Sequence, residues 1–349
     1  MAAIESSAAP TDIVTGSHVG PCCPGWSMTQ VAGPETVRGL AVVICTYQRA
    51  ASLSRFLDSM GTQSKPAQLV IIDASLDDAT ERMIGARGDL QGLAECFTYI
   101  RVTGKLRGLT RQRNFGAARV RTDLIAFFDD DIVLLPGCLS ELERVHREFE
   151  GVAGVMGFVP NEFETPSLRW RLRVWLGAIP DLRPGRYHRA GISVPWDFQP
   201  PVDEVLEGEW IPGGVTMWKT EIVRRLRFNE SFVGYAAGED LEFSLRAASL
   251  GRLMFAGRAH LLHLHEGSGR PDPYRLGYMS IRNAYEIHRR CLKGRTRLDV
   301  LRFAYAAAID IAVWTVGMAR PSASETRQFL RGRLRFVTDT LRITSPRLD

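Results

Sequence analysis

The sequence lacks the short motifs that mark several common nucleotide-binding and metal-binding proteins. It has no Gly-x-x-x-x-Gly-Lys-Ser/Thr phosphate loop, and no Gly-x-Gly-x-x-Gly segment follows an apolar run. None of its six cysteines forms a Cys-x-x-Cys pair or a Cys/His cluster with zinc spacing. These absences argue against a P-loop enzyme, a dinucleotide oxidoreductase and a cysteine-bound zinc site, and favour free thiols in a reducing, cytoplasmic setting.

Long uncharged apolar segments are also missing. The most apolar stretch, residues 301–319, contains Arg302 and Asp310, so its uninterrupted parts are too short to span a bilayer. It predicts a core or interfacial helix. The chain does not open with a basic segment followed by an apolar one, so we expect no signal peptide. The net charge of +5 favours anionic partners such as phosphates or a membrane surface. We expect no nucleic-acid partner.

Apolar runs and helical segments alternate four times between residues 40 and 150. The runs LAVVICTY, QLVIID, CFTYIRV and LIAFF are typical of buried strands, and each precedes a segment with helical spacing. This alternation predicts an α/β fold with a mostly parallel sheet flanked by helices. Such sheets bind ligands beyond the carboxyl ends of their strands, where Thr46, Asp73 and Asp129 to Asp131 fall.

Three carboxylates follow the fourth apolar run, in DLIAFFDDDIVLLPG. If the strand continues through them, Asp129 and Asp131 point to one side and Asp130 to the other. Two converging carboxylates at a strand end suit a divalent Mg or Mn ion that keeps positions open for phosphate oxygens. The alternative is a solvated turn with a helix-capping aspartate.

Five segments follow one another in a characteristic order. They are VVICTYQRA, IIDASLDDAT, RQRNFGAARVRTDLIAFFDDD, GYAAGEDLEFSLRAASLG and HLLHLHEGSGR. In this order they resemble the motifs of family 2 glycosyltransferases, although the Asp-Ser-Asp spacing of the second segment is one residue shorter than the usual form. The resemblance covers roughly residues 38–270. It implies the GT-A fold, a nucleotide-sugar donor and a divalent cation.

The resemblance implies a metal site built from the acidic cluster and the late histidines. Asp131 should bind the ion directly, and Asp129 should contact the ribose or bridge to the ion through water. His263 or His265 could supply a nitrogen ligand, and alignment of AHLLH with the family's strand favours His263. For either histidine alone, a surface or capping role is the alternative.

The resemblance also implies a donor site at the strand ends. Arg113 could hold a phosphate or the sugar through a bidentate contact, and Gly213 and Gly214 could let the backbone approach the donor sugar. The alternatives are strand-end turns, a helix N-cap at Asp77, a surface ion pair at Arg113 and a simple turn at the glycines. The predicted nucleotide and donor residues are Thr46, Tyr47, Arg49, Asp73, Asp77, Arg113, Asn114, Asp129, Asp130, Gly213 and Gly214.

The acceptor hydroxyl must lose its proton as it attacks the anomeric carbon, and a positioned carboxylate can accept it. The resemblance assigns this role to Asp240, with Glu239 supporting it or contacting the acceptor. The alternative is that Gly-Glu-Asp only gives a helix a favourable negative N-terminus. The prediction is an inverting, single-displacement transfer.

The sequence predicts three regions. Residues 1–37 form a flexible lead-in. Residues 38–270 form the transferase domain, with a nucleotide-binding half (38–150) and an acceptor-side half (151–270). Residues 271–349 form a helical C-terminal extension.

An insert at residues 164–200 interleaves Trp with six arginines. This composition favours a phospholipid surface or a lipid-linked acceptor, whereas the alternative is a helix that packs its tryptophans on the core. We therefore expect a UDP-sugar donor, a glycan or lipid-linked acceptor in polysaccharide or cell-envelope synthesis, and a cytoplasmic protein with peripheral membrane contact. A non-catalytic binding protein derived from this fold and a nucleotidyltransferase are the competing interpretations.

Overall fold

The computed structural model describes residues 14–15, 36–267, 271–316 and 324–344. Its centre is a ten-stranded sheet with the order β1-β4-β3-β2-β5-β9-β7-β10-β6, and β8 pairs with β10 beside this path. The strands are β1 (Val14–Thr15), β2 (Val37–Thr46), β3 (Gln68–Asp73), β4 (Cys96–Val102), β5 (Thr122–Asp129), β6 (Ile132–Leu134), β7 (Val152–Phe158), β8 (Val205–Gly208), β9 (Val215–Lys219) and β10 (Arg252–His263).

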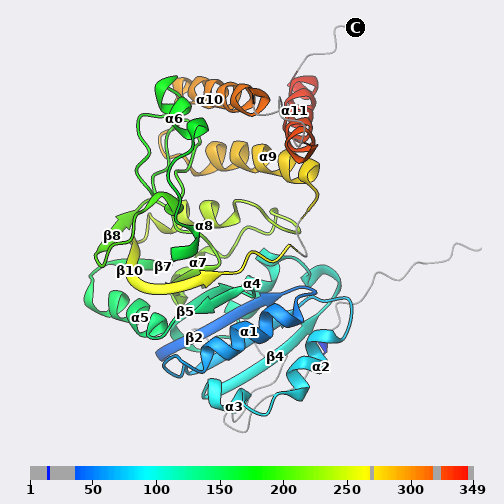
Figure 1. The fold of residues 1–349 in the computed structure, drawn as a ribbon, viewed down its shortest axis with the longest axis vertical. Coiled ribbons are helices and arrows are strands. Elements are labelled where there is room, and N and C mark those ends of the chain that lie inside the picture. The colour runs from blue at the N-terminus through cyan, green and yellow to red at the C-terminus, as the bar shows by residue number, and fades with distance from the viewer. Residues whose placement is uncertain (1–13, 16–35, 268–270, 317–323, 345–349) are drawn as a thin grey trace, which may run out of the picture.

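The helices follow the alternation expected from the sequence. They are α1 (Ala50–Met60), α2 (Ala79–Ala86), α3 (Leu90–Leu93), α4 (Leu109–Ala117), α5 (Cys138–Glu148), α6 (Leu168–Trp175), α7 (Thr220–Leu226), α8 (Glu239–Ala247), α9 (Pro273–Cys291), α10 (Arg297–Val316) and α11 (Ser324–Thr344). Figure 1 shows α6, α9, α10 and α11 gathered at the end of the molecule opposite β4 and α3.

The first half of the sheet is parallel and deeply buried. β4, β3, β2 and β5 are neighbours and pair in parallel, and every residue of β3 is buried. Each fully buried Val, Leu or Ile side chain contributes about 1.5–3 kcal/mol to the free energy of folding. Strands that are buried on both faces are therefore continuous apolar segments in the sequence. The predicted fold class is confirmed: a mostly parallel central sheet, flanking helices and helices at the C-terminal end.

Two local expectations differ from the structure. β5 ends at Asp129, and Asp130 and Asp131 form a turn before β6, so strand alternation does not govern the three acids. The first four residues of HLLHLHEGSGR belong to β10, which ends at His263 and pairs with β6. Within the predicted flexible lead-in, Val14 and Thr15 pair with β4; residues 1–13 and 16–35 lie outside the described part.

The expected C-terminal helices are present as α9, α10 and α11, apart from residues 317–323 and 345–349, which the structure does not describe. α10 buries Ala306, Asp310 and Val313 and exposes Leu298 and Leu301. It therefore packs one face and leaves another at the surface. In the described residues, no helix combines the length and the apolar character needed to cross a membrane.

Candidate active site

Strand register brings the predicted polar residues to one edge of the sheet. Thr46 lies opposite Asp73 in the pairing of β2 with β3, and Cys45 lies opposite Asp129 in the pairing of β2 with β5. β9 adds Val215 opposite Phe128, which sets Gly214 beside Asp129. The edge forms because the carboxyl ends of β2, β3 and β5 coincide.

Arg49 offsets the charge of the two acids in the turn. Its Nη1 lies 3.1 Å from Oδ1 of Asp130 and 3.3 Å from Oδ2 of Asp131. Thr46 donates its hydroxyl to Asp130 at 2.7 Å. Burial raises the pKa of Asp130 to about 7, although Thr46 and Arg49 oppose the shift. Asp130 is thus an internal, satisfied carboxyl, and it shares Arg49 with Asp131.

The bend of β10 carries His263 to Asp131. The register of β10 shifts between Ala256 and His260, after which His263 pairs with Ile132, directly beyond the turn. Its Nε2 lies 3.2 Å from Oδ1 of Asp131, and its Nδ1 lies 2.6 Å from Oε1 of Glu162. Burial lowers the pKa of His263, but the two carboxylates outweigh burial and raise it to about 10.

His265 occupies a different position from His263. It has a φ of 54°, and its Nε2 lies 3.2 Å from Oε1 of Glu162. Among the described residues it makes no ion pair with Asp131. The geometry therefore favours His263 over His265 as the partner of Asp131, as the alignment suggested, and ligation by either one stays a prediction.

The donor set around His263 fits a divalent cation. Ligand atoms of Glu162, His263 and His265 lie within 4.8 Å of one another. The buried Oδ1 of Asp131 faces this group, 3.2 Å from Nε2 of His263. Carboxylate oxygens and imidazole nitrogens together are suitable ligands for a divalent metal ion. Glu162 was missed from the sequence, because it follows β7 in a short helical turn (Pro160–Glu162) that no motif marks.

Arg113 joins the two halves of the site. Only 3% of its side chain is exposed, and it donates to Oε1 of Glu239 at 2.6 Å and to Oδ1 of Asp129 at 3.3 Å. A Cβ at Gly213 would lie 2.5 Å from Nη1 of Arg113, and one at Gly214 would overlap the Asp129 carboxylate. Glycine is therefore needed at both positions to leave space for the acids and Arg113. This need is separate from the predicted approach of the donor sugar to the backbone.

Glu239 and Asp240 begin α8 behind Gly238, which has a φ of 84°. Burial raises the pKa of Glu239 to about 8 against the opposing effect of Arg113, and its Oε2 is buried and makes no hydrogen bond to any described residue. Asp240 is half-buried and accepts from the backbone N–H of Gly213 at 3.2 Å. Burial raises the pKa of Asp240 as well.

A cavity of about 240 Å³ is lined both by residues predicted to bind the donor and the metal and by the residue predicted to act as the base. These residues are Asp129, His263 and Asp240. Asp197 and Trp196, which the sequence reasoning did not single out, line it too. Burial raises the pKa of Asp197 to about 6, with Glu162 and Glu164 adding to the rise. The cavity can thus present a base and several carboxylates to a polar ligand.

Of the predicted donor residues, Asp129 and Gly214 line this cavity, and four others have different surroundings. Asp73 is buried and accepts from the Tyr99 hydroxyl at 2.7 Å. Asn114 exchanges hydrogen bonds with the backbone of Phe228. Asp77 is exposed and accepts from the N–H of Ala79, the first residue of α2, at 3.2 Å. Tyr47 is exposed at the sheet edge. The contacts of Asp73 and Asn114 are internal, and donor binding by these four residues stays a prediction.

Comparisons with known proteins agree with this arrangement. Residues 41–197 match the model of the family described as glycosyl transferase family 2. No curated protein sequence matches the chain significantly.

Two solved structures share the fold. Mannosyltransferase PcManGT from Pyrobaculum calidifontis, in complex with GDP-Man and Mn²⁺, is 15% identical with a TM-score of 0.53; the match covers 88% of this chain and 90% of that one. GalNAc-T7 with UDP, GalNAc and Mn²⁺ is 14% identical with a TM-score of 0.57, covering 89% of this chain and 59% of that one. Residues 41–197 are thus a glycosyl transferase family 2 domain, in a chain that has the GT-A fold of these glycosyltransferases.

Proposed function

We propose that the protein is a metal-dependent, inverting glycosyltransferase that moves a sugar from a nucleotide-sugar donor to an acceptor hydroxyl. The observation that carries the proposal is the single cavity lined by Asp129, Asp240 and His263. It sets the carboxylate suited to act as base beside the groups suited to the donor. With Asp240 as the base, as the family resemblance implies, the transfer is a direct displacement without a covalent enzyme intermediate.

Asp131 and His263, with Asp129 nearby, are the residues that would hold the cation. A bound divalent ion neutralises the charge that develops on a departing nucleoside diphosphate. The structures of similar fold contain Mn²⁺ together with GDP-Man or UDP, which supports a nucleotide-sugar donor here, and we propose a UDP-sugar. Arg49 would keep Asp130 and Asp131 in place before the donor binds.

The metal assignment is tested by Asp131→Ala. Removing this carboxylate deletes the oxygen that faces Nε2 of His263 at 3.2 Å, so UDP binding should lose its dependence on Mn. Calorimetric titration of UDP with and without Mn measures this, with the exposed Glu150→Ala as the matched control. Undiminished Mn-dependent UDP binding by Asp131→Ala would refute the assignment.

Asp240 is proposed as the base that takes the acceptor proton. Its half-buried carboxylate faces the cavity, and its raised pKa makes it a better proton acceptor than an ordinary aspartate. Asp240→Asn should abolish transfer, followed as release of nucleoside diphosphate, while UDP affinity stays the same. Transfer at the wild-type rate in this variant would exclude the role.

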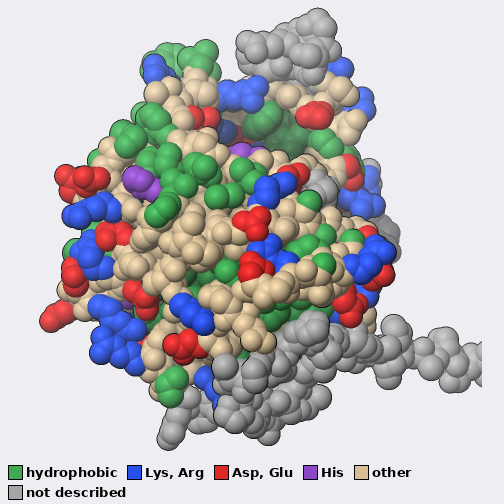
Figure 2. Space-filling view, turned by 60° about the horizontal axis from the view of Figure 1, so that its bottom comes forward, with side chains coloured by type: hydrophobic (Ala, Val, Ile, Leu, Met, Phe, Trp, Pro, Cys, Tyr) green, Lys and Arg blue, Asp and Glu red, His purple; other side chains and the backbone are tan. Residues whose placement is uncertain are grey.

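The acceptor is proposed to be a glycan or lipid-linked alcohol used in cell-envelope synthesis, at the cytoplasmic face of a membrane. Arginines of the insert at residues 164–200 form internal ion pairs in the structure. Arg173 pairs with Asp310, and Arg189 pairs with Asp299. Acidic and basic side chains are interspersed over the visible face of the molecule (Figure 2). The insert is therefore not a free cationic surface.

The outer face of α6 is the part that still supports membrane contact. Leu168, Arg171 and Trp175 share this face and are exposed, a combination typical of interfacial helices. Trp175→Ser should reduce flotation with anionic vesicles, whereas Leu250→Ser, at an exposed position after α8, should not. Equal flotation of both variants would remove the support for membrane contact.

A further inference from the structure

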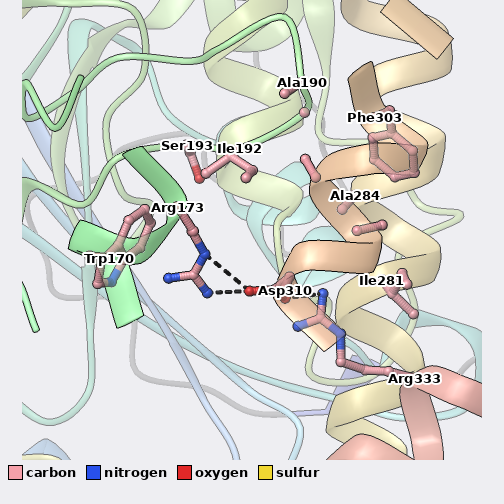
Figure 3. Close-up of a pocket in the computed structure, with 13 residues that line it drawn as sticks. Trp170, Arg173, Ala190, Ile192, Ser193, Ile281, Ala284, Phe303, Asp310 and Arg333 are labelled. Carbon is pink, nitrogen blue, oxygen red and sulfur yellow. Dashed lines mark hydrogen bonds and ion pairs between the residues drawn. The ribbon is translucent and has the colours of Figure 1, made fainter. Parts of the chain in front are cut away.

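A second cavity lies among the C-terminal helices, away from the acidic edge of the sheet. It has a volume of about 190 Å³ and is enclosed by α6, α9, α10, α11 and residues 190–193. Figure 3 shows Arg173 and Arg333 approaching Asp310 from different elements, with Phe303 and Ala284 elsewhere on the wall. The cavity therefore has a charged part and an apolar part.

The charged part has more donors than its own acid uses. Nε of Arg173 donates to Oδ1 of Asp310 at 3.1 Å, and Nη2 of Arg333 lies 2.6 Å from Oδ2 of Asp310. Nε of Arg333 is buried and has no hydrogen-bond partner in the part of the chain that the structure describes. Within the described residues, Nη1 of Arg173 and Nη1 of Arg333 also make no hydrogen bond. Two guanidinium groups and one carboxylate leave a net charge of +1 at this point.

Burial makes this excess charge unfavourable in the ligand-free protein. The side chains of Arg173 and Arg333 are 10% and 14% exposed. Burial lowers the pKa of Arg333, Asp310 opposes the shift, and Arg173 adds to it. A second anion would relieve the repulsion between the two guanidinium groups, and their N–H groups match phosphate oxygens well.

Apart from the Ser193 hydroxyl, the Trp170 indole and the backbone of residues 190–193, the rest of the wall is apolar. Ile281 of α9 and Phe303, Ala306 and Ala307 of α10 line the cavity opposite the arginines. None of these side chains can hydrogen-bond to a polar ligand, so this part of the cavity suits a hydrocarbon chain.

We propose that this cavity binds an anionic amphiphile: a phosphate group attached to an apolar chain, with the phosphate against Arg173 and Arg333 and the chain against Phe303 and Ala307. The proposal does not depend on the proposed glycosyl transfer. This would be a second ligand site, and the resemblance to family 2 glycosyltransferases does not imply it.

The cavity is linked to the active site by one loop. Ala190 to Ser193 line the second cavity, and Pro195 to Asp197 line the first, with only the buried Val194 between them. A ligand in the second cavity therefore lies against the same loop that carries Asp197 into the first. This places the bound phosphate on the acceptor side of the molecule.

The test is calorimetric titration of the full chain with decyl phosphate below its micelle concentration. Neither a donor nor a metal is present, so the result does not depend on the metal or base assignments. Saturable binding is expected, weakened at least about tenfold for inorganic phosphate, decanol and decanoate. If inorganic phosphate bound as tightly as decyl phosphate, the apolar chain would not be recognised and the amphiphile assignment would be overturned. If decanoate bound as tightly, the phosphate assignment would be overturned.

Paired variants separate a ligand site from a structural clamp. Arg333→Met removes the buried charge, and Ala307→Leu fills the cavity without altering charge; both should weaken decyl phosphate binding at least about tenfold. Arg331→Met and Ala308→Leu change exposed positions on the same helices and should not. If Arg333 and Asp310 only hold the helices together, Arg333→Met lowers the melting temperature and decyl phosphate fails to bind the wild type. That result, or equal binding by all variants, overturns the proposal.

Vesicles distinguish the two sources of such a ligand. Sedimentation with phosphatidylcholine vesicles that contain phosphatidic acid is compared between wild type and Arg333→Met. Binding that depends on Arg333 supports a bilayer lipid as the ligand. If decyl phosphate binds in solution but vesicle binding does not depend on Arg333, the ligand is instead a lipid-linked phosphate that binds outside the bilayer.

Discussion

Arg113 offers the sharpest test of how the two halves of the active site hold together. It is nearly fully buried, lies 2.6 Å from Glu239 and 3.3 Å from Asp129, and its guanidinium stands 5.3 Å from the centre of the Phe228 ring. Arg113→Met keeps most of the side-chain volume and removes the charge. It leaves Glu239, which is 6% exposed, without its cation.

The expected magnitude follows from the burial of the pair. Removing one partner of a buried ion pair costs about 3–5 kcal/mol, because the remaining carboxylate must either stay charged without a partner or take up a proton from a solution above its folded pKa. Glu239→Gln in the same protein removes this carboxylate. The double variant should therefore lose less stability than the sum of the two single variants, with an interaction energy of about 0.5–3 kcal/mol.

Urea denaturation of the wild type, both single variants and the double variant at pH 8.5 measures these energies. Arg111→Met, on the same helix but 35% exposed, is the control and should stay within about 0.5 kcal/mol of the wild type. A loss below about 1 kcal/mol for Arg113→Met, or energies that simply add, would show that Arg113 is not the internal cation of the site.

Two further predictions concern neighbouring residues. Gly214→Ala should destabilise the protein by about 1–3 kcal/mol and weaken UDP binding, because the added Cβ overlaps the Asp129 carboxylate. Gly85→Ala is the control: its added Cβ would meet no neighbouring group within 4 Å, so the free energy of unfolding in urea should be unchanged or raised. Burial raises the pKa of Glu239 from 4.5 to about 8, so between these values the folded state keeps a proton that the unfolded state has lost. Its contribution to stability should therefore fall as pH rises from 4.5 to 8, and denaturation across that range should show a flatter profile in Glu239→Gln. An unchanged profile would contradict the raised pKa.

The sequence by itself determined the sheet and the position of its functional edge. The apolar runs of β2, β3, β4 and β5 are continuous because both faces of a parallel sheet are covered, so their periodicity and order could be read directly. The residues that end these strands, such as Thr46 and Asp129, follow from the same pattern. The motif order was sufficient to predict the family, because each motif is tied to a strand end or a helix start.

Tertiary structure decided which of those residues meet. The end of β5 at Asp129 set Asp130 and Asp131 in a turn, and the bend of β10 brought His263 to Asp131 from more than 130 positions away in the chain. Glu162 and Asp197 reached the cavity through loops without periodic pattern, which local sequence does not encode. Asp73 and Asn114 turned inward because buried polar groups must find partners, and those partners, Tyr99 and Phe228, are fixed only when distant segments pack.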